Sequence, residues 1–546
     1  MAPTQHLWWQ HAVIYQIYPR SFQDSNGDGV GDLPGITQRL DYLHDVLGVD
    51  AVWLSPFYPS PMADFGYDVS DYCAVDPIFG TLDDFDVLVA ALHERGIKIL
   101  IDYIPNHTSD HHPWFQESRS SRDNPKRDWY YWRDGKAEGG PPNNWLSVFG
   151  GSAWQWDEHT GQYYLHSFLA EQPDLNWRHP EVVDAMLDVM RFWLDRGVDG
   201  FRIDVAHYLM KDPQFRDNPP APPDAVTPYK SLADYDSQLH VYDLGNPDTH
   251  EVFRKIRRVL DSYSAERPRT SVAEIHVFDW SNWASYFGVN LDEIHMPFNF
   301  GLVGVEWDAI RIREVVDAVE GALPSGAWPS YVLGNHDEPR LATRFGAAYA
   351  PLAAMLILTL RGTPTTYYGD EIGMHDVPIP PERARDPWGK RVVGLGRDPE
   401  RTPMQWDSGP NAGFCPPDVE PWLPIADDYR QINVAAEEDD PRSLLTLSRR
   451  LLALRRVTPA LRGGSYAAVE RVPSQCFVYT RRTEDDMCVV ALNVSDIDQL
   501  VTLEGMTGTV CLSTYLDREG PEDLQRLILR PHEGCIVQIE SAPPTP

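Results

Sequence analysis

The chain has 546 residues, 42% hydrophobic and 23% charged, so it is long enough for two or three globular domains and is not disordered. It carries 81 acidic and 47 basic side chains, a formal net charge of −34. Such a charge repels phosphate backbones and anionic lipid, so we expect neither nucleic acid nor a membrane surface as a partner. The longest apolar run, around Pro351–Leu360, is too short to span a bilayer.

The cysteines do not form a disulfide or zinc framework. There are six in the whole chain, and no CxxC pair occurs among the four near the C-terminus. Free thiols in a reducing compartment are therefore expected. The first residues have neither a basic stretch nor an apolar segment, so we expect no signal peptide and a cytoplasmic protein.

Short apolar, β-branched runs alternate with segments of helical period along most of the chain. The predicted strands are Val13–Tyr18, Ala51–Ser55, Lys98–Ile104, Gly200–Val205, Thr270–Ile275, Ile294–Phe298, Ser330–Leu333 and Thr365–Tyr368. Predicted helices between and after them include Leu82–Arg95, Val182–Arg196, Thr249–Tyr263 and Ser443–Arg456. This alternation favours a parallel sheet, and eight units favour a (β/α)₈ barrel over an open sheet.

Two stretches interrupt the alternation. Residues 107–176 are rich in Trp, Tyr, Gly, Asn and Pro, which predicts a small domain inserted after the third strand. Its Trp129–Trp132 run is either a sugar-stacking surface or the core of that domain. Residues 463–546 hold short alternating segments typical of an antiparallel β-sandwich. The barrel would then comprise 1–106 and 177–462, with a proline-rich exposed loop at Asp217–Tyr229.

Polar clusters follow four of the predicted strands. They are Asn106–His107, Arg202–Asp204, Glu274–His276 and Asn335–Asp337. The carboxyl ends of parallel barrel strands converge on one mouth, where catalytic groups lie, so Asp204, Glu274 and Asp337 should meet there. Each acid could instead be a solvated loop residue or a strand cap, but four such clusters at successive strand ends weaken that alternative.

Converging carboxylates beside arginine and histidine, without a metal-ligand cluster, suit glycosyl transfer. One acid must stay neutral to protonate a leaving oxygen, and another must stay ionised to attack the anomeric carbon. Arg202 lies two residues before Asp204 on the same strand and therefore points to the same side. We expect it to keep Asp204 ionised.

These motifs together resemble the α-amylase family of glycoside hydrolases, family 13. The resemblance rests on Asp102–His107, Gln172–Trp177, Gly200–Val205, Glu274 and Asn335–Asp337. The opening Val13–Leu33 and the segment Arg401–Asp407 resemble the α-glucosidase and oligo-1,6-glucosidase branch. The resemblance covers essentially the whole chain and implies the (β/α)₈ barrel, the inserted domain and the C-terminal β-sandwich.

Residue roles follow from the resemblance. It implies that Asp204 is the nucleophile, Glu274 the general acid/base and Asp337 a third carboxylate that binds sugar hydroxyls and distorts the ring. The substrate-binding residues that it implies are Asp64, Tyr67, His107, Phe168, Gln172, Arg202, His336 and Arg397. Taken alone, His107 and His336 would be read as core histidines, and Asp64 with Arg397 as a surface ion pair.

The loop Asp24–Asp32 places oxygen donors at alternate positions among glycines, a pattern suited to a hard cation such as Ca²⁺. Gly35 stands where an EF-hand needs a bidentate Glu, so an EF-hand is a poor interpretation. The resembled branch implies a structural Ca²⁺ held by Asp24, Asn26, Asp28, the Val30 carbonyl and Asp32. A plain Asn-Gly and Asp-Gly turn is the alternative.

The activity that the resemblance implies is that of a retaining, exo-acting α-glucosidase, which releases glucose from short α-glucosides without an organic cofactor. Two alternatives stay open: a glucosyltransferase or isomerase of the sucrose isomerase or trehalose synthase type, and a non-catalytic scaffold like a transporter heavy chain. Val205 follows the nucleophile where this branch often has Val for α-1,6 preference, which favours isomaltose over maltose. The sequence does not indicate the oligomeric state.

Overall fold

The computed structural model describes residues 7–222, 230–391 and 394–541. Its central sheet contains the eight predicted barrel strands, paired in parallel in the order β10-β9-β8-β7-β3-β2-β1-β11. These strands are β1 (Ile14–Ile17), β2 (Ala51–Leu54), β3 (Lys98–Tyr103), β7 (Gly200–Ile203), β8 (Thr270–Ala273), β9 (Met296–Asn299), β10 (Ser330–Tyr331) and β11 (Thr365–Tyr367). A parallel bridge between Val332 and Thr365 joins the two ends of this order. The (β/α)₈ barrel is confirmed.

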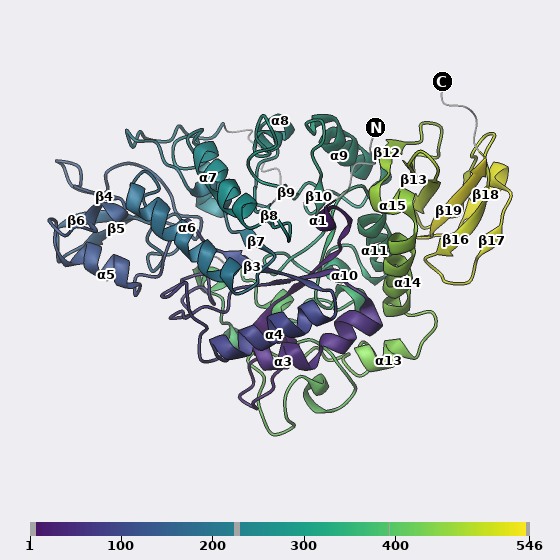
Figure 1. The fold of residues 1–546 in the computed structure, drawn as a ribbon, viewed down its shortest axis with the longest axis horizontal. Helices are drawn as coiled ribbons and strands as arrows, with labels where there is room; N and C mark the ends of the chain where they lie inside the picture. The colour runs from purple at the N-terminus through teal and green to yellow at the C-terminus, as the bar shows by residue number, and fades with distance from the viewer. Residues whose placement is uncertain (1–6, 223–229, 392–393, 542–546) are drawn as a thin grey trace.

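Helices surround the barrel in the places expected between strands (Figure 1). The longer ones are α4 (Leu82–Glu94), α6 (Pro180–Asp195), α7 (Thr249–Ser262), α9 (Ala309–Ala322), α11 (Ala350–Thr359) and α14 (Leu444–Val457). The shorter ones are α1 (Trp8–His11), α2 (Pro19–Phe22), α3 (Leu33–Gln38), α8 (Trp280–Ser285), α10 (Leu341–Arg344), α12 (Pro387–Arg391), α13 (Val434–Glu438) and α15 (Pro459–Gly463). α4 begins with a reciprocal capping box between Thr81 and Asp84, which explains its sharp start.

Seven of the eight barrel strands end one or two residues before their predicted ends, and for two of them, β7 and β8, the difference bears on the site. β7 ends at Ile203 and β8 at Ala273, so Asp204 and Glu274 are the first residues beyond their strands. Their backbone N–H groups still donate hydrogen bonds to the neighbouring strand. Asp204 N–H donates to the Tyr103 carbonyl and Glu274 N–H to the Ile203 carbonyl, each at a distance of 2.9 Å. The carboxylates are thereby anchored at the carboxyl end of the barrel.

The segment that interrupts the barrel after β3 forms a small antiparallel sheet at one end of the molecule (Figure 1). It contains α5 (Pro113–Ser120) and the strands β4 (Trp132–Arg133), β5 (Trp154–Asp157) and β6 (Gln162–Leu165), ordered β4-β6-β5. All four residues of Trp129–Trp132 are buried, and the Arg127 guanidinium lies 3.5 Å from the centre of the Trp132 ring. Of the two readings left open for this run, the structure supports the core.

The C-terminal strands lie at the opposite end of the molecule from the inserted sheet (Figure 1). A six-stranded antiparallel sheet has the order β12-β13-β14-β19-β16-β17, and β15 pairs separately with β18. Their bounds are β12 (Ser465–Ala468), β13 (Cys476–Arg482), β14 (Met487–Asn493), β15 (Gln499–Val501), β16 (Thr507–Ser513), β17 (Gly520–Pro521), β18 (Leu527–Leu529) and β19 (Gly534–Ser541). Phe477 and Tyr479 face the main core while Val478 faces the sandwich core, the alternation expected of a strand buried on both sides.

Within the described ranges, the six cysteines are all unpaired, and four of them are buried. None of the helices in these ranges combines the length and the hydrophobicity that crossing a membrane requires. The predicted loop Asp217–Tyr229 lies partly outside the described residues, which omit 223–229.

Candidate active site

One cavity of about 320 Å³ opens at the carboxyl ends of the barrel strands. Nine of the eleven predicted catalytic and substrate-binding residues line it: Asp64, Tyr67, His107, Phe168, Gln172, Asp204, Glu274, Asp337 and Arg397. Arg202 and His336 do not line the cavity, but each bonds to side chains that do. Tertiary structure thus brings together residues that lie as much as 333 positions apart in sequence, as in the contact between Asp64 and Arg397.

Arg202 is the centre of one half of the pocket. Its Nη1 donates to Asp102 Oδ1 and to Asp204 Oδ1, both at 2.6 Å, and its Nη2 donates to Glu274 Oε2. Asp102 also accepts from the Trp53 indole over 2.9 Å. We call these four charged residues, Arg202, Asp102, Asp204 and Glu274, the Arg202 cluster. All four are buried.

Three carboxylates around one guanidinium leave the Arg202 cluster with an excess of negative charge. Burial raises the pKa of Asp102 to about 6 despite the opposing effect of Arg202. Burial also raises the pKa of Asp204 well above its usual range, and Glu274 and Asp102 add to that rise. The expectation that Arg202 keeps Asp204 ionised needs correction: Arg202 does bond Asp204, but it is shared with two competing acids, so its field is divided.

The backbone beyond the first of these acids is strained. Val205 has φ of 35°, in the left-handed region that a β-branched residue rarely adopts. In this conformation its N–H points at Glu274 Oε2 over 3.2 Å. Left-handed backbone at such a residue is characteristic of functional sites, where surrounding contacts hold it in place.

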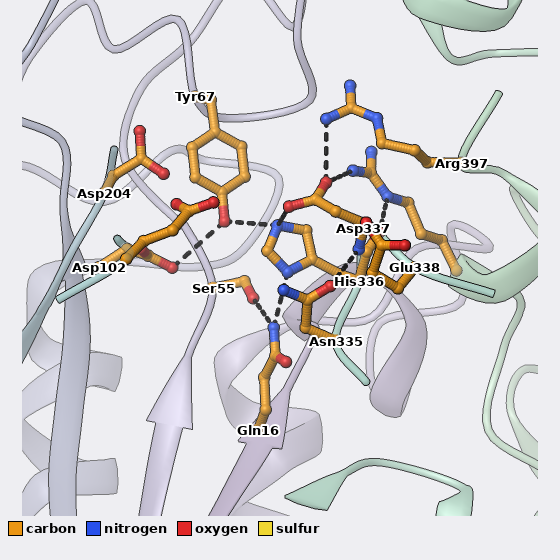
Figure 2. A network of polar contacts seen from close by, with 12 residues as sticks. Gln16, Ser55, Tyr67, Asp102, Asp204, Asn335, His336, Asp337, Glu338 and Arg397 are labelled. Carbon is orange, nitrogen blue, oxygen red and sulfur yellow. Dashed lines mark hydrogen bonds and ion pairs between the residues drawn. The ribbon is translucent and has the colours of Figure 1, made fainter. Parts of the chain in front are cut away.

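Arg397 is the centre of the opposite half. Its Nη1 donates to Asp337 Oδ1 at a distance of 3.0 Å (Figure 2). Its Nη2 donates to Asp64 Oδ1 at 2.6 Å, and Arg401 Nη2 donates to the same Asp337 oxygen at 2.7 Å. Asp386 binds Arg397 through both carboxylate oxygens, at 2.7 and 3.1 Å. We call Arg397, Arg401, Asp64, Asp337 and Asp386 the Arg397 cluster. The Asp64–Arg397 contact is therefore a buried network and not a surface ion pair.

Two guanidinium groups on one oxygen reverse the electrostatics found around Arg202. Burial alone would raise the pKa of Asp337, but His336, Arg397 and Arg401 outweigh it and hold that pKa well below its usual range. Asp337 is therefore ionised at neutral pH. Asp64 differs, because burial raises its pKa more than Arg397 lowers it.

His336 is a fully buried, neutral histidine that links the two halves. Its Nε2 lies 2.7 Å from the Tyr67 hydroxyl and its Nδ1 lies 2.8 Å from the Gln16 amide nitrogen (Figure 2). Because the amide donates to Nδ1, Nε2 carries the hydrogen and donates to Tyr67. Burial lowers the pKa of His336 to about 3. Its ring also stacks on that of Tyr67, with the centroids 5.4 Å apart.

His107 closes the side of the pocket formed by the inserted segment. Its Nε2 lies 3.1 Å from the amide nitrogen of Gln172, which also donates to Asp64 Oδ2 over 3.2 Å. Burial lowers the pKa of His107 to about 4, so this ring is neutral as well. The Phe168 ring lies 5.3 Å from it, centroid to centroid. The bonds of His107 and His336 face the pocket network, which sets them apart from ordinary core histidines.

The structure adds site residues that sequence reasoning did not assign. Asp102 and Asp386 supply the extra carboxylates of the two clusters, and Gln16 orients His336. Asp102 lies inside a motif that the resemblance already used, so its position at the end of β3 was an available signal. Asp386 belongs to no recognised motif and was not predictable. The apolar and aromatic part of the pocket lining is formed by Val148, Phe149, Tyr208, Leu232, Tyr235, Leu244, Phe278 and Trp388.

In the Asp24–Asp32 loop, the carboxylates accept most of their hydrogen bonds from nearby backbone N–H groups. Asp24 accepts from the N–H groups of Asn26, Gly27 and Gly29, at 3.0, 2.7 and 2.9 Å. Asp32 accepts from Gly35 N–H, over 2.6 Å, as the N-cap of α3. Within the described ranges, no group of three or more His, Cys, Asp or Glu side chains is arranged to hold a metal. The all-oxygen donor set nevertheless suits a hard cation, because Asp24 Oδ2, Asn26 Oδ1 and Asp28 Oδ1 each accept one hydrogen bond and keep a second lone pair.

Fold and site together define a (β/α)₈ protein with a carboxylate-rich pocket at the carboxyl ends of its strands, the arrangement of barrel enzymes. The family model described as "Alpha amylase, catalytic domain" matches residues 16–464. The chain belongs to this family.

Individual relatives cover nearly the whole chain. It is 44% identical to a protein named as a probable alpha-glucosidase of Rhizobium meliloti (strain 1021), over 94% of this chain and 95% of that one. It is 38% identical to an oligo-1,6-glucosidase of Parageobacillus thermoglucosidasius, over 98% and 99%. The crystal structure of the alpha-glucosyl transfer enzyme XgtA matches with a TM-score of 0.93 at 42% identity, over 98% and 100%. The trehalulose synthase MutB of Pseudomonas mesoacidophila MX-45 matches with 0.87 at 35%, over the same shares.

Proposed function

We propose that this protein is a retaining, exo-acting α-glucosidase that releases glucose from the non-reducing end of short α-glucosides. The observation that carries the proposal is the pair Asp204 and Glu274, which line the pocket and bond to the two terminal nitrogens of one guanidinium. Retaining glycosidases hold their two carboxyl groups ~5–5.5 Å apart so that one can attack directly. Two carboxylates that share one guanidinium suit that short separation.

In the proposed reaction Asp204 attacks the anomeric carbon while Glu274 donates a proton to the leaving oxygen. Water then attacks the glucosyl-Asp204 intermediate, and Glu274 takes up a proton from it, which restores both groups and retains the configuration. Arg202 bonds to both carboxylates, so they titrate as a pair and not as independent groups. The raised pKa of Asp204 and the lowered pKa of Glu274 favour the proton on Asp204 in the free protein, whereas the reaction uses the other state of the pair, with Asp204 ionised and Glu274 protonated. Asp337, held ionised, would accept hydrogen bonds from sugar hydroxyls.

Exo action follows from the Arg397 cluster. Asp64, Arg397 and Asp386 form a continuous buried network, which would block any further sugar beyond a terminal glucose. Short substrates should therefore be hydrolysed from the end, with soluble starch nearly inert. Vigorous internal cleavage of starch by the native protein would contradict the closed pocket.

A glucosyltransferase or isomerase is the second candidate, supported by the structural similarity to XgtA and to MutB. The two candidates differ in whether water or a sugar hydroxyl attacks the intermediate, and the catalytic carboxylates are the same in both. Incubation with maltose, isomaltose, sucrose and trehalose, followed by separation of products, distinguishes them. Free glucose as the main product supports the hydrolase, with isomaltose preferred to maltose if Val205 marks α-1,6 preference. New disaccharides as the main product support the transferase, and no turnover at all would support a non-catalytic scaffold.

A structural Ca²⁺ in the loop Asp24–Asp32 is a further part of the proposal. Asp24, Asn26, Asp28, the Val30 carbonyl and Asp32 would hold it, and it would stabilise the loop that joins β1 to β2. The proposal includes no organic cofactor and a cytoplasmic location, the latter supported by the unpaired state of all six cysteines.

A further inference from the structure

His276 lies beside Glu274 but has no role in the reaction as derived so far. Its Nε2 lies 2.7 Å from Glu274 Oε1, and its ring stacks on Phe300 with centroids 4.3 Å apart and planes 16° from parallel. The side chain is 30% exposed and lines the pocket. Stacking on a buried ring fixes the orientation of the imidazole, so its contact with Glu274 is a built feature of the site.

The two oxygens of Glu274 have partners of different kinds. Oε2 accepts from Arg202 and from the Val205 N–H, donors that keep their protons throughout the accessible pH range. Oε1 faces His276, and histidine is the side-chain type that gains and loses a proton near neutral pH. Of the protein contacts described for this carboxyl, the one at Oε1 joins it to a side chain that can exchange a proton.

We propose that His276 is a positioning residue that shares one proton with Glu274, storing it on Nε2 and passing it to Oε1 when Glu274 acts as the acid. In the transfer the Nε2–H bond breaks, the Oε1–H bond forms and the imidazolium becomes neutral. Glu274 then gives this proton to the leaving oxygen, regains one from the attacking water, and returns it to Nε2. This inference rests on the proposed function, because it assigns the proton supply of the same reaction.

The charged surroundings explain why such a store is needed. Burial raises the pKa of Glu274, but Arg202 and then His276 outweigh burial and lower that pKa far below its usual range. The donors on both oxygens thus stabilise Glu274 as the carboxylate, so the acid step needs a neighbouring group that can return a proton to it. The other ionisable groups that face the pair are Asp204, Asp102, Asp337 and His207. The pKa of His207 is lowered to about 3, by burial first and by His276 second, so His207 stays neutral and cannot take the same role.

The kinetic test uses His276→Gln, which keeps a hydrogen-bond donor but cannot store a proton. For methyl α-glucoside, kcat/KM at neutral pH should fall by ~10²-fold, the order expected when general acid catalysis is impaired. The basic limb of the pH profile should move to lower pH, because the pair loses its second proton-binding site. With p-nitrophenyl α-glucoside the loss should be only a few-fold, since that leaving group needs little protonation. His207→Gln, a matched change at the neighbouring ring, should leave the position of the basic limb unchanged.

A purely structural role for His276 predicts equal losses on both substrates and an unmoved basic limb, and that outcome would overturn the inference. A second measurement does not depend on activity: the NMR signal of the His276 Nε2 proton, identified by its loss in His276→Gln. Loss of the partner carboxylate in Glu274→Gln should shift that signal at fixed pH. An unchanged signal would reject the proton-sharing pair even in an active glucosidase, whereas the expected shift in a protein without glucosidase activity would reject the proposed function alone.

Discussion

The two halves of the pocket use the same residue types in different proportions, with one arginine for three acids in the Arg202 cluster and two arginines for three acids in the Arg397 cluster. In the Arg202 cluster one guanidinium bonds to three carboxylates, whereas in the Arg397 cluster two guanidinium groups bond to a single oxygen of Asp337. The pKa of Asp204 is accordingly raised, by burial and by its acidic neighbours, while that of Asp337 is lowered by His336, Arg397 and Arg401 against burial.

Because of this difference, the carboxyl groups of the two halves are suited to different roles in the reaction. Carboxyl groups that share one guanidinium with other acids can exchange protons, which acid–base and nucleophilic steps require. A carboxylate held by two arginines is a permanently charged acceptor that can bind sugar hydroxyls without titrating. We call the Arg202 cluster the chemical half and the Arg397 cluster the binding half. Because both are buried, burial does not distinguish them, and the number of guanidinium groups per acid does.

The largest effect should come from the chemical half. Asp204→Ala removes the nucleophile, and turnover should fall by ~10³-fold or more, as expected when covalent catalysis is lost. The thermal unfolding curve should be retained, because Asp204 lies beyond the end of β7 and not within the strand core. Near-normal hydrolysis by the folded variant would contradict the assignment of Asp204.

Glu274→Gln should produce the next largest loss, and one that depends on the leaving group. Hydrolysis of natural disaccharides should fall by ~10²–10⁴-fold, the usual contribution of general acid–base catalysis. The first step on p-nitrophenyl α-glucoside, measured as a burst of nitrophenol, should be much less affected. Equal losses on activated and natural glucosides would argue that Glu274 is not the acid.

Arg397→Ala tests the binding half. It removes the link among Asp64, Asp337 and Asp386 and leaves buried carboxylates unpaired, so kcat/KM on disaccharides should fall by ~10-fold to 10²-fold. Steady-state kinetics on maltose and isomaltose, beside the exposed-pair control Arg311→Ala, measure the effect. A loss no larger than that of the control would show that the network does not form the sugar site.

Asp102→Asn sharpens the comparison by removing one of the three acids that share Arg202. Ionised Asp102 raises the pKa of Asp204, so its neutralisation should lower that pKa and leave Asp204 ionised in more acidic solution. The acidic limb of the kcat/KM profile should therefore move to lower pH, with a modest change in the maximum rate. If the acidic limb stays in place or moves to higher pH, competition from Asp102 is not the cause of the raised pKa of Asp204.

The smallest effect on rate should come from chelation of Ca²⁺, because the loop Asp24–Asp32 belongs to neither half of the pocket. If Ca²⁺ binds the loop Asp24–Asp32, its removal should lower the melting temperature by mass action and leave initial rates at mild temperature almost unchanged. Calorimetry with and without chelator, repeated with Asp28→Ala, measures this. A melting temperature that is the same with and without chelator would favour the plain turn, and an immediate loss of activity at constant melting temperature would contradict a structural role.

Much of the architecture could be predicted from the sequence because it depends on local patterns. The eight barrel strands are short apolar runs bounded by turns, and each predicted run overlaps an observed strand. Their ends were less predictable, since β7 and β8 stop where the chain turns and not where the apolar pattern stops. The left-handed Val205 and the bonds of Glu274 determine that turn, and neither is visible in a hydrophobic pattern.

By itself, the sequence determined which acids stand at the strand ends and to which family their motifs belong, because strand periodicity and motif spacing are local properties of the chain. Only the tertiary structure decided how those charges are shared. Asp102 shares a guanidinium that lies 100 positions away, Asp64 bonds Arg397 across 333 positions, and Glu274 meets Arg202 across 72 positions. Because the energy of a buried charge depends on every neighbour within a few ångströms, the contrast between the proton-exchanging acids around Arg202 and the permanently ionised Asp337 arises only when the barrel folds.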